Sequence, residues 1–562
     1  MSVKFQKLVV MLAILAAAAL VAVGCGSDDK GDGGGSANLA KKQELVANIG
    51  DEAEPGLFNP AGMSYLDAIN SKGYVQFAGL YRVVGNDNSI EPWLADGEPE
   101  ISDDGLTYTI KMRDDAEWSD GEPIVAEDVV TAVNYALEPD TGAYFAGFLT
   151  GMVGAEEKLA GKAKGPIDGI KAVDDHTIEI KLKQVVPWFS QLLTIQIFYP
   201  LRADQLEKLG KDYGKSTETA VSGPFKLTEY KPGDSIVYEK NDKYFKADDV
   251  KLDKITFRMI GEPTTAAQEF TRGDLDTGLQ NTMFDGAEID KWKGEDTFVS
   301  GETVGSQYMY MNTTNKELSD PKVRQALALA INRKDIVENI TKKGDVPTNI
   351  IVPPAVPGSE VWSEGAQDFL SSDGTPDADK AKDLLSEAGW DPKETLTLYY
   401  VSDSGNAAAI AEQIQSNLAD VGVKVELKPT AGDVFSTVGY GISPVKKDVD
   451  LLLQGWIQDY LDAQDWYQLF YSKNIEAGLN GSNYSSEDYD KIYDEAIKTV
   501  NDEDRFQLYK QLEAKLTGPD GDMPAAPLYV QADATLTQTW VNDFELLPSG
   551  IIYWENLSIN EH

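Results

Sequence analysis

The stretch 320–454 alternates helical and extended patterns, and this alternation restricts the possible folds more than any other feature. Segments whose apolar residues recur with the spacing of one helix face are joined by short apolar runs typical of buried strands. Strand, helix, strand alternation predicts an α/β fold whose parallel strands carry helices on their faces. The helical segments are 321–331, 377–388 and 406–421, and the extended ones are 396–401, 423–427 and 449–454.

Residues at the ends of these helices support their assignment. Asp320 is a suitable N-cap and Pro321 a suitable first helical residue, because a helix start leaves that N–H unbonded anyway. Gly389 and Gly422 suit helix C-termini, where a left-handed residue is favoured. Elsewhere we expect strands at 44–49, 106–112, 177–182 and 526–530, and a helix at 126–137.

Charge excludes one large class of partners. The chain has 562 residues, enough for about three to four domains. Its 93 acidic and 50 basic residues give a formal net charge of −43. Such a surface repels phosphate backbones and anionic membranes, so we expect no nucleic-acid partner.

The first residues predict export and a lipid anchor. Lys4 and Lys7 precede an apolar run over 8–23 that is short for a spanning helix and typical of a signal peptide, here 1–24. The run ends at Cys25 in a segment that resembles the bacterial lipobox, whose cysteine is acylated. Residues 25–42 then form a flexible tether, and acyl chains would hold the protein at the membrane. A plain signal peptide with an incidental thiol is the alternative.

One aspartate near the end of a predicted strand suggests a binding site. Leu451 to Leu453 read as a buried strand, and Gly455 and Trp456 follow it. Asp459 then lies among apolar and aromatic neighbours, where a charge is costly without a cationic partner. Because ligands bind at strand ends in α/β sheets, we expect Asp459 to await a positively charged ligand group. Alternatively, it caps a helix that begins near Leu461.

Patterns that would indicate an enzyme or a metal site are missing from the sequence. Two histidines, His176 and His562, and one cysteine cannot supply a histidine or thiolate metal site. No nucleophile elbow or phosphate-binding loop occurs. Asp459, Asp462 and Asp465 are spaced by three, but they lack the glycine and glutamate of a calcium-binding hand. We expect no catalytic activity, cofactor or metal.

Eight short motifs follow one another in a fixed order, at 79–81, 104–110, 116–121, 185–189, 222–227, 239–245, 323–327 and 455–460. Together they resemble the oligopeptide/dipeptide family of ABC-transporter solute-binding proteins, solute-binding family 5. The resemblance covers about residues 45–562, nearly the whole mature chain.

The resemblance implies a two-lobed periplasmic-binding-protein type II fold with an additional domain inserted in the first lobe. A ligand would lie between the lobes, and hinge closure would bury it. The implied boundaries are 43–76, 201–306 and 531–562 for the first lobe, 307–530 for the second, and 77–200 for the extra domain.

It also implies roles for residues 455–460. Asp459 would bind the α-ammonium group of a peptide, and the main chain of Gly455, Trp456, Ile457 and Tyr460 would run beside the peptide backbone. Such pairing uses hydrogen-bonding groups that every peptide has, and hydrated side-chain pockets then allow loose sequence preference.

The resemblance implies further ligand-binding positions, although the motifs around them are less specific. Leu66 matches a first-lobe segment along the other edge of the peptide, and Tyr144, Asn281 and Tyr308 match pocket-lining positions, although each also fits ordinary packing. Where some relatives have an arginine for the peptide carboxylate, this chain has Leu453. That difference favours a longer peptide or a cation located elsewhere.

The expected function is that of a monomeric, lipid-anchored receptor outside the cytoplasm. It would capture oligopeptides and deliver them to the permease and ATPase subunits of an ABC importer. One alternative is the binding of an oligosaccharide or another non-peptide solute, and a second is a surface receptor or adhesin without a transport partner. A hydrolase fits the sequence least well.

Overall fold

The computed structural model describes residues 38–284, 286, 288–402, 405–430, 438–439, 441 and 443–562. The expected signal peptide, Cys25 and most of the tether lie outside the described residues. Leu39 pairs with Asn560, and the main-chain N–H of Ala40 donates to the carbonyl of Ile559 at 2.8 Å. The compact unit therefore begins at Leu39, inside the segment expected as tether. None of its described helices has the length and apolar character needed to cross a membrane.

The first sheet has five strands in the order β11-β1-β10-β9-β8. Strand β1 pairs in parallel with β10 and β11, and β10, β9 and β8 are joined antiparallel. Leu45 and Ala47 of β1 are fully buried, as the apolar run predicts. The bounds are β1 Glu44–Asn48, β8 Phe225–Lys231, β9 Ser235–Lys240, β10 Lys254–Arg258 and β11 Thr277–Gly278, and helix α8, Pro263–Arg272, follows β10.

The second sheet has six strands in the order β13-β17-β12-β16-β14-β15. The predicted parallel pairing is confirmed for β14 with β15 and β16, whereas β12, β13 and β17 run antiparallel to their neighbours, so the sheet is mixed. Its bounds are β12 Phe298–Met311, β13 Val346–Pro347, β14 Thr395–Val401, β15 Lys424–Thr430, β16 Leu451–Ile457 and β17 Ala525–Leu536.

The helices predicted around this sheet form with the expected caps. They are α9 Pro321–Ala330, α12 Ala378–Glu387 and α13 Ala407–Asp420. The Asp320 carboxylate accepts the main-chain N–H of Lys322 at 2.9 Å, and Gly389 and Gly422 have φ angles of +70° and +85°. Helix α13 packs on β14 and β15, and α9 packs on β17 and α12.

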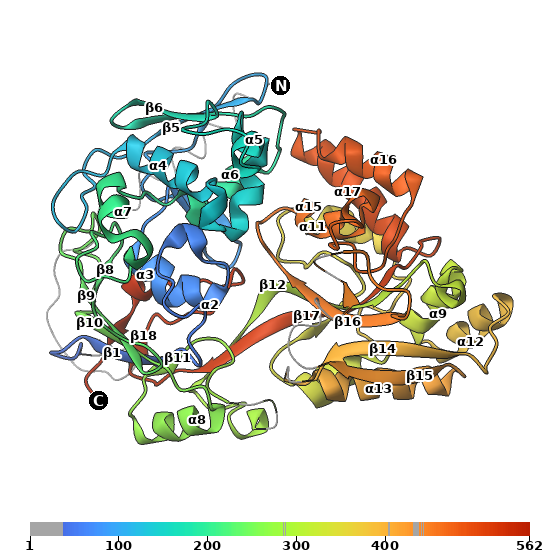
Figure 1. Cartoon of the computed structure of the whole chain (residues 1–562). Coiled ribbons are helices and arrows are strands. Elements are labelled where there is room, and N and C mark those ends of the chain that lie inside the picture. Colours follow the sequence, from blue (N-terminus) through green and yellow to red (C-terminus); the bar gives the residue numbers. More distant parts are fainter. Residues whose placement is uncertain are drawn as a thin grey trace, which may run out of the picture. The chain divides into compact units, whose positions relative to one another are not determined.

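Strands β12 and β17 connect the two sheets (Figure 1). They pair antiparallel from Phe298 with Leu536 to Tyr310 with Ala525. At one end Leu536 packs in an apolar cluster with α8, and at the other Met311 packs in the core of the second sheet. The register shifts between Glu302 and Ser306, where this ladder passes from one core to the other. The strand pair therefore joins two lobes.

Residues 77–200 form their own sheet, in the order β4-β5-β7-β6, beside the hairpin β2–β3. The alternation predicted for β5 and β7 is confirmed, because Tyr108, Ile110, Ile178 and Ile180 are buried on one face. The bounds are β2 Tyr81–Val84, β3 Ser89–Pro92, β4 Glu100–Ile101, β5 Thr107–Lys111, α4 Ala126–Ala136, β6 Ile170–Asp174 and β7 Thr177–Lys181.

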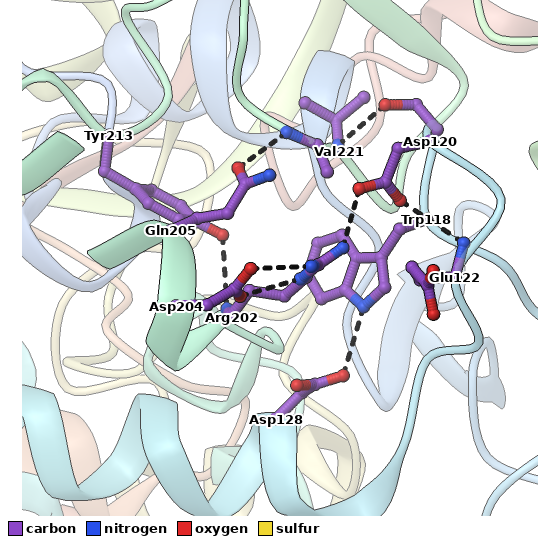
Figure 2. A network of polar contacts seen from close by, with 11 residues as sticks. Trp118, Asp120, Glu122, Asp128, Arg202, Asp204, Gln205, Tyr213 and Val221 are labelled. Carbon is purple, nitrogen blue, oxygen red and sulfur yellow. Dashed lines mark hydrogen bonds and ion pairs between the residues drawn. The ribbon is translucent and has the colours of Figure 1, made fainter. Parts of the chain in front are cut away.

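A polar network ties this segment to residues that follow position 200 (Figure 2). The Arg202 guanidinium donates to Asp120 at 2.7 Å and to both carboxylate oxygens of Asp204 at 3.0 and 2.7 Å. Nearby, the Trp118 indole N–H donates to Asp128 at 3.1 Å. Because the bonds of Arg202 cross the proposed boundary at residue 200, segment 77–200 is fastened to the first lobe.

The remaining elements are short helices and one small sheet, apart from two longer helices late in the second lobe, α16 Glu487–Ala496 and α17 Asp502–Thr517. The short ones are α2 Leu66–Ala68, α3 Tyr74–Gln76, α5 Ala155–Leu159, α6 Phe189–Leu192, α7 Ala203–Leu209, α10 Arg333–Asp335, α11 Ser359–Trp362 and α15 Gln464–Tyr467, with β18 Val541–Asn542 paired to β19 Ser558–Ile559.

Candidate functional site

The turn that follows β16 is organised around the buried carboxylate of Asp465. Its Oδ2 accepts the main-chain N–H of Asp459 at 2.8 Å and the indole N–H of Trp456 at 3.2 Å. Its Oδ1 accepts the side-chain amide of Gln468 at 3.0 Å. Three donors from both ends of the turn thus converge on one side chain, which fixes where Asp459 lies.

The carboxylate of Asp459 is directed to a different environment. Among the described residues it has neither a hydrogen bond nor an ion pair, and it lines a cavity. The alternative that it caps the next helix is wrong, because α15 begins only at Gln464 and its N-cap residue is Ala463. Burial raises the pKa of Asp459 to about 7. The pKa of Asp465 is raised as well, by burial and by the charge of Asp459.

The cavity at Asp459 has a volume of about 270 Å³ and is lined from both lobes and from residues 77–200. Four of the predicted residues, Leu66, Ile457, Asp459 and Tyr460, line it. The other polar and aromatic residues of its wall were not predicted from the sequence; they are Ser64, Tyr65, Tyr74, Phe145, Gln191, Thr194, Gln196, Gln458 and Ser549.

Large apolar side chains are exposed at this cavity. Tyr65 and Ile457 line it with 65 % and 56 % of their surface exposed. Tyr144, also 65 % exposed, packs edge-on against the cavity residue Phe145 at 5.0 Å. Burial and then the charge of Asp459 raise the pKa of Tyr144, which places its hydroxyl near that carboxylate. Exposed apolar groups that cluster in a concave site are typical of a binding surface.

Tyr460 is positioned by aromatic contacts with Phe148 and Trp188 of residues 77–200. Its ring is stacked on Trp188 at 6.2 Å with an interplanar angle of 7°, and it meets Phe148 edge-on at 5.3 Å. The side chain is buried. This contact joins the second lobe to residues 77–200 at the wall of the cavity.

Strand β16 leaves one edge open beside the cavity. It pairs with β12 over its full length, Leu451–Ile457, but with β14 only at Leu451 and Leu452. From Leu453 to Ile457 the second edge therefore has no strand partner among the described residues. A free edge presents main-chain donors and acceptors to which an extended peptide can add as a further strand.

Gly455 and Trp456 lie behind this edge. A Cβ at Gly455 would come within 2.7 Å of the Gln307 side chain and 2.9 Å of the Ser306 carbonyl, so the glycine allows β12 to approach closely. The Trp456 indole N–H donates its hydrogen bond to Asp465. Neither residue lines the cavity, and their predicted role in ligand binding rests on the main chain.

A second cavity, of about 460 Å³, opens between the lobes beyond β16. It contains Asn281, whose side-chain amide donates to Asp533 at 2.9 Å, and Leu453, the position that departs from some relatives. Tyr308 lies elsewhere: it is fully buried, and its hydroxyl donates to the carbonyl of Ile351. Side chains alternate along β12, so Gln307 faces the cavity and Tyr308 faces the core.

The three regularly spaced aspartates have separate partners. Asp462 is buried against Arg505 at 3.1 Å and the Tyr509 hydroxyl at 2.5 Å, and it also accepts the main-chain N–H of Gln464 at 2.9 Å. Asp465 instead accepts the N–H groups of Asp459 and Trp456, and Asp459 faces the cavity. Across the described residues no group of three or more histidine, cysteine or acidic side chains is placed to hold a metal ion.

Comparison with known proteins places the chain among solute receptors. Residues 89–478 match the model of the bacterial extracellular solute-binding proteins, family 5. The chain belongs to this family. Its members bind solutes and are not enzymes, and the two-lobed fold implied by the sequence motifs is confirmed.

Relatives and solved structures match over most of their length. The oligopeptide-binding protein OppA of Bacillus subtilis is 30 % identical over 96 % of this chain and 96 % of its own. The unliganded open form of the periplasmic murein tripeptide-binding protein MppA is 27 % identical, covers 94 % of this chain and 99 % of its own, and has a TM-score of 0.77. The peptide-bound OppA of Listeria monocytogenes is 25 % identical, covers 93 % and 100 %, and has a TM-score of 0.69.

Proposed function

We propose that this protein is a lipid-anchored receptor that captures oligopeptides between its lobes and delivers them to an ABC importer. Relatives that match nearly its whole length are named oligopeptide- or dipeptide-binding proteins. Cys25 would carry the acyl chains, and permease and ATPase subunits on other chains would take up the peptide. The receptor would act as a monomer, since one cleft contains the whole site.

The observation that carries this proposal is that a free strand edge and a carboxylate without a partner among the described residues lie next to each other. The edge from Leu453 to Ile457 offers main-chain groups, and Asp459 lies two residues beyond its end. A peptide added along this edge would place its α-ammonium group at Asp459. The ion pair formed there would balance the charge that burial makes costly.

The distance between the two cavities suggests the ligand's length. Leu453 and Ile457 are four residues apart on a strand, about 13 Å at ~3.3 Å per residue. A peptide that begins at Asp459 and reaches the second cavity therefore has about five residues. Lys343 lines that cavity and forms no ion pair within the described chain, so it is our candidate for the peptide carboxylate in place of an arginine at Leu453.

Calorimetry with a defined pentapeptide tests the assignment. We expect binding by the wild type, weakening by N-acetylation of the peptide, and a loss of about 2–5 kcal/mol in Asp459→Ala, the range for truncating one partner of a buried charge pair. Equal affinity for free and acetylated peptides would sink the proposal.

The anchor is tested separately. In cells fed a labelled fatty acid, the wild type should carry the label and partition with membranes, and Cys25→Ser should do neither. An unlabelled wild type would remove the anchor from the proposal and leave peptide capture untouched.

A further inference from the structure

The second cavity contains two buried polar atoms that no described residue satisfies. Asp345 is 7 % exposed: its Oδ1 accepts the main-chain N–H of Ala532 at 2.6 Å, but its Oδ2 has no hydrogen-bond partner. Thr341 is 3 % exposed; its hydroxyl makes no hydrogen bond of ordinary length, although it lies close enough to Asp345 to oppose the rise that burial causes in the pKa of that carboxyl. Both residues line the cavity. Buried polar groups are normally paired, so two orphans in one cavity indicate a group that is bound there.

The charges around these atoms favour a cation. Asp533 lies near Asp345, since burial and the charge of Asp345 both raise its pKa. Burial and the charge of Asp533 in turn raise the pKa of Asp67 to about 6. Lys343 opposes this by lowering the pKa values of Asp345 and Asp533. Asp345 is the carboxylate among these that lines the cavity, and Asp533, which accepts the Asn281 amide, lies behind it.

The remaining walls suit the stem of a long side chain. Leu453, Ile410 and Phe284 supply apolar surface, and Gln307 and Gln531 supply side-chain amides. Lysine and arginine place a charged head at the end of an apolar stem, and such side chains bury the stem while the head reaches a polar partner. A neutral apolar side chain would fill the cavity and leave Asp345 Oδ2 unpaired.

We propose that the second cavity is a specificity pocket for a lysine or arginine side chain of the bound peptide, held by Asp345 Oδ2 and the Thr341 hydroxyl. This inference rests on the proposed capture of oligopeptides and names a preferred class among them. Because the pocket lies about four residues along β16 from the amino end of the ligand, the basic residue belongs near the fourth or fifth position. Lys343 remains available there for the carboxylate of the same ligand.

The experiment compares matched pentapeptides of alanine with a free amino end, in which one residue is replaced in turn by lysine or by norleucine. Norleucine has the same stem without the charge. Calorimetry on the full-length wild type should show at least tenfold tighter binding for lysine than for norleucine at one position, the fourth or fifth.

Two variants locate the effect. Asp345→Asn keeps an oxygen for the Ala532 N–H and should abolish the preference for lysine, and Thr341→Val should reduce it. Asp420→Asn, at the exposed end of α13, should retain it in full.

The outcomes separate this inference from the proposed function. If alanine, norleucine and lysine pentapeptides bind equally well, or if Asp345→Asn keeps the preference, the pocket assignment is wrong and peptide capture stands. If no pentapeptide binds, both fail. Should Asp345→Asn not fold, the wild-type comparison of lysine with norleucine still decides.

Discussion

The main-chain N–H of Asp459 donates to the buried carboxylate of Asp465 at 2.8 Å, while the carboxylate of Asp459 itself faces the cavity. These two acidic residues, six positions apart, therefore have different roles. Asp465 shapes the turn from within the second lobe, and Asp459 presents a charge to the cleft. Asp465, which does not line the cavity, therefore holds in place the residue that does.

Replacing Asp465 by alanine should weaken peptide binding at least tenfold. The change leaves the N–H groups of Asp459 and Trp456 unpaired, and each buried orphan costs about 1–3 kcal/mol. The turn would shift to pair them and carry Asp459 away from its position. Calorimetry with a pentapeptide measures the loss, and Asp465→Asn, which retains one acceptor oxygen, should recover part of it.

Asp462 supplies the matched control. It is equally buried and three residues away, but it binds Arg505 and Tyr509, and Arg505 keeps a second partner in Asp502 at 2.9 Å. We expect Asp462→Asn to lower the melting temperature with little effect on affinity. If Asp465→Ala behaves in the same way, the turn does not position Asp459.

Peptide affinity should pass through a maximum between about pH 7 and pH 8. Asp459 must be ionised to bind an ammonium group, and burial raises its pKa to about 7. Below that pH its proton must be released on binding, so affinity falls about tenfold per pH unit. Above about pH 8 the peptide's own α-ammonium group, of pKa about 7.7–8.0, loses its charge.

Titration calorimetry from pH 5 to pH 9.5 gives this profile. Besides burial, the charge of Asp459 also contributes to raising the pKa values of Asp465, Tyr144 and Tyr460. Asp459→Asn should remove the acid limb. An acid limb that survives in this variant would belong to another group.

Features set by neighbouring residues could be predicted from the sequence. The start of α9 is one, because the bond from Lys322 to Asp320 spans two residues and needs no distant partner. The buried strand at Leu451 to Leu453 is another, since its composition alone requires burial. Local capping and apolar periodicity thus recover the elements of the second lobe.

Features that depend on contacts between distant residues could not be predicted from the sequence. Nothing within residues 459–465 shows which aspartate faces the cleft, because the sorting depends on Arg505 and Tyr509, more than 40 residues away. Tyr308 was predicted to line the ligand pocket, but the register of β12 directs Gln307 to the cavity instead. Asp345 lies in no recognisable sequence motif, and only its burial and its unpaired oxygen identify it as a candidate binding residue.

Gly455→Ala should lower both stability and affinity. The added Cβ would lie 2.9 Å from the Ser306 carbonyl, a main-chain atom that moves only with β12. Overpacking of this kind costs about 1–3 kcal/mol and would displace the edge that faces the cleft. Urea unfolding and calorimetry measure the two effects. Gly305→Ala is the control, because its Cβ would meet side-chain atoms and no main-chain atom, the nearest being the Gln531 amide oxygen at 2.8 Å; a similar loss there would contradict the explanation.

The stability of the protein should fall as pH rises from about 4.5 to 7, and Glu513 should account for part of the fall. This glutamate is fully buried in α17, where it accepts bonds from Ile351, Tyr467 and Thr517. Burial raises its pKa from 4.5 to about 7. The folded state therefore keeps a proton that the unfolded chain has released, which favours folding fully below pH 4.5 and is lost by pH 7.

Glu513→Gln should flatten that dependence by up to about 3 kcal/mol, the free energy that corresponds to a shift of this size. Urea unfolding of wild type and variant at pH 5 and pH 8 gives the difference directly. Asp459 and Asp67, whose pKa values are raised to about 7 and about 6, keep part of the wild-type slope in the variant. Glu503→Gln, exposed on the same helix, should change nothing, and an unchanged slope in Glu513→Gln would mean that Glu513 is ionised in the folded protein.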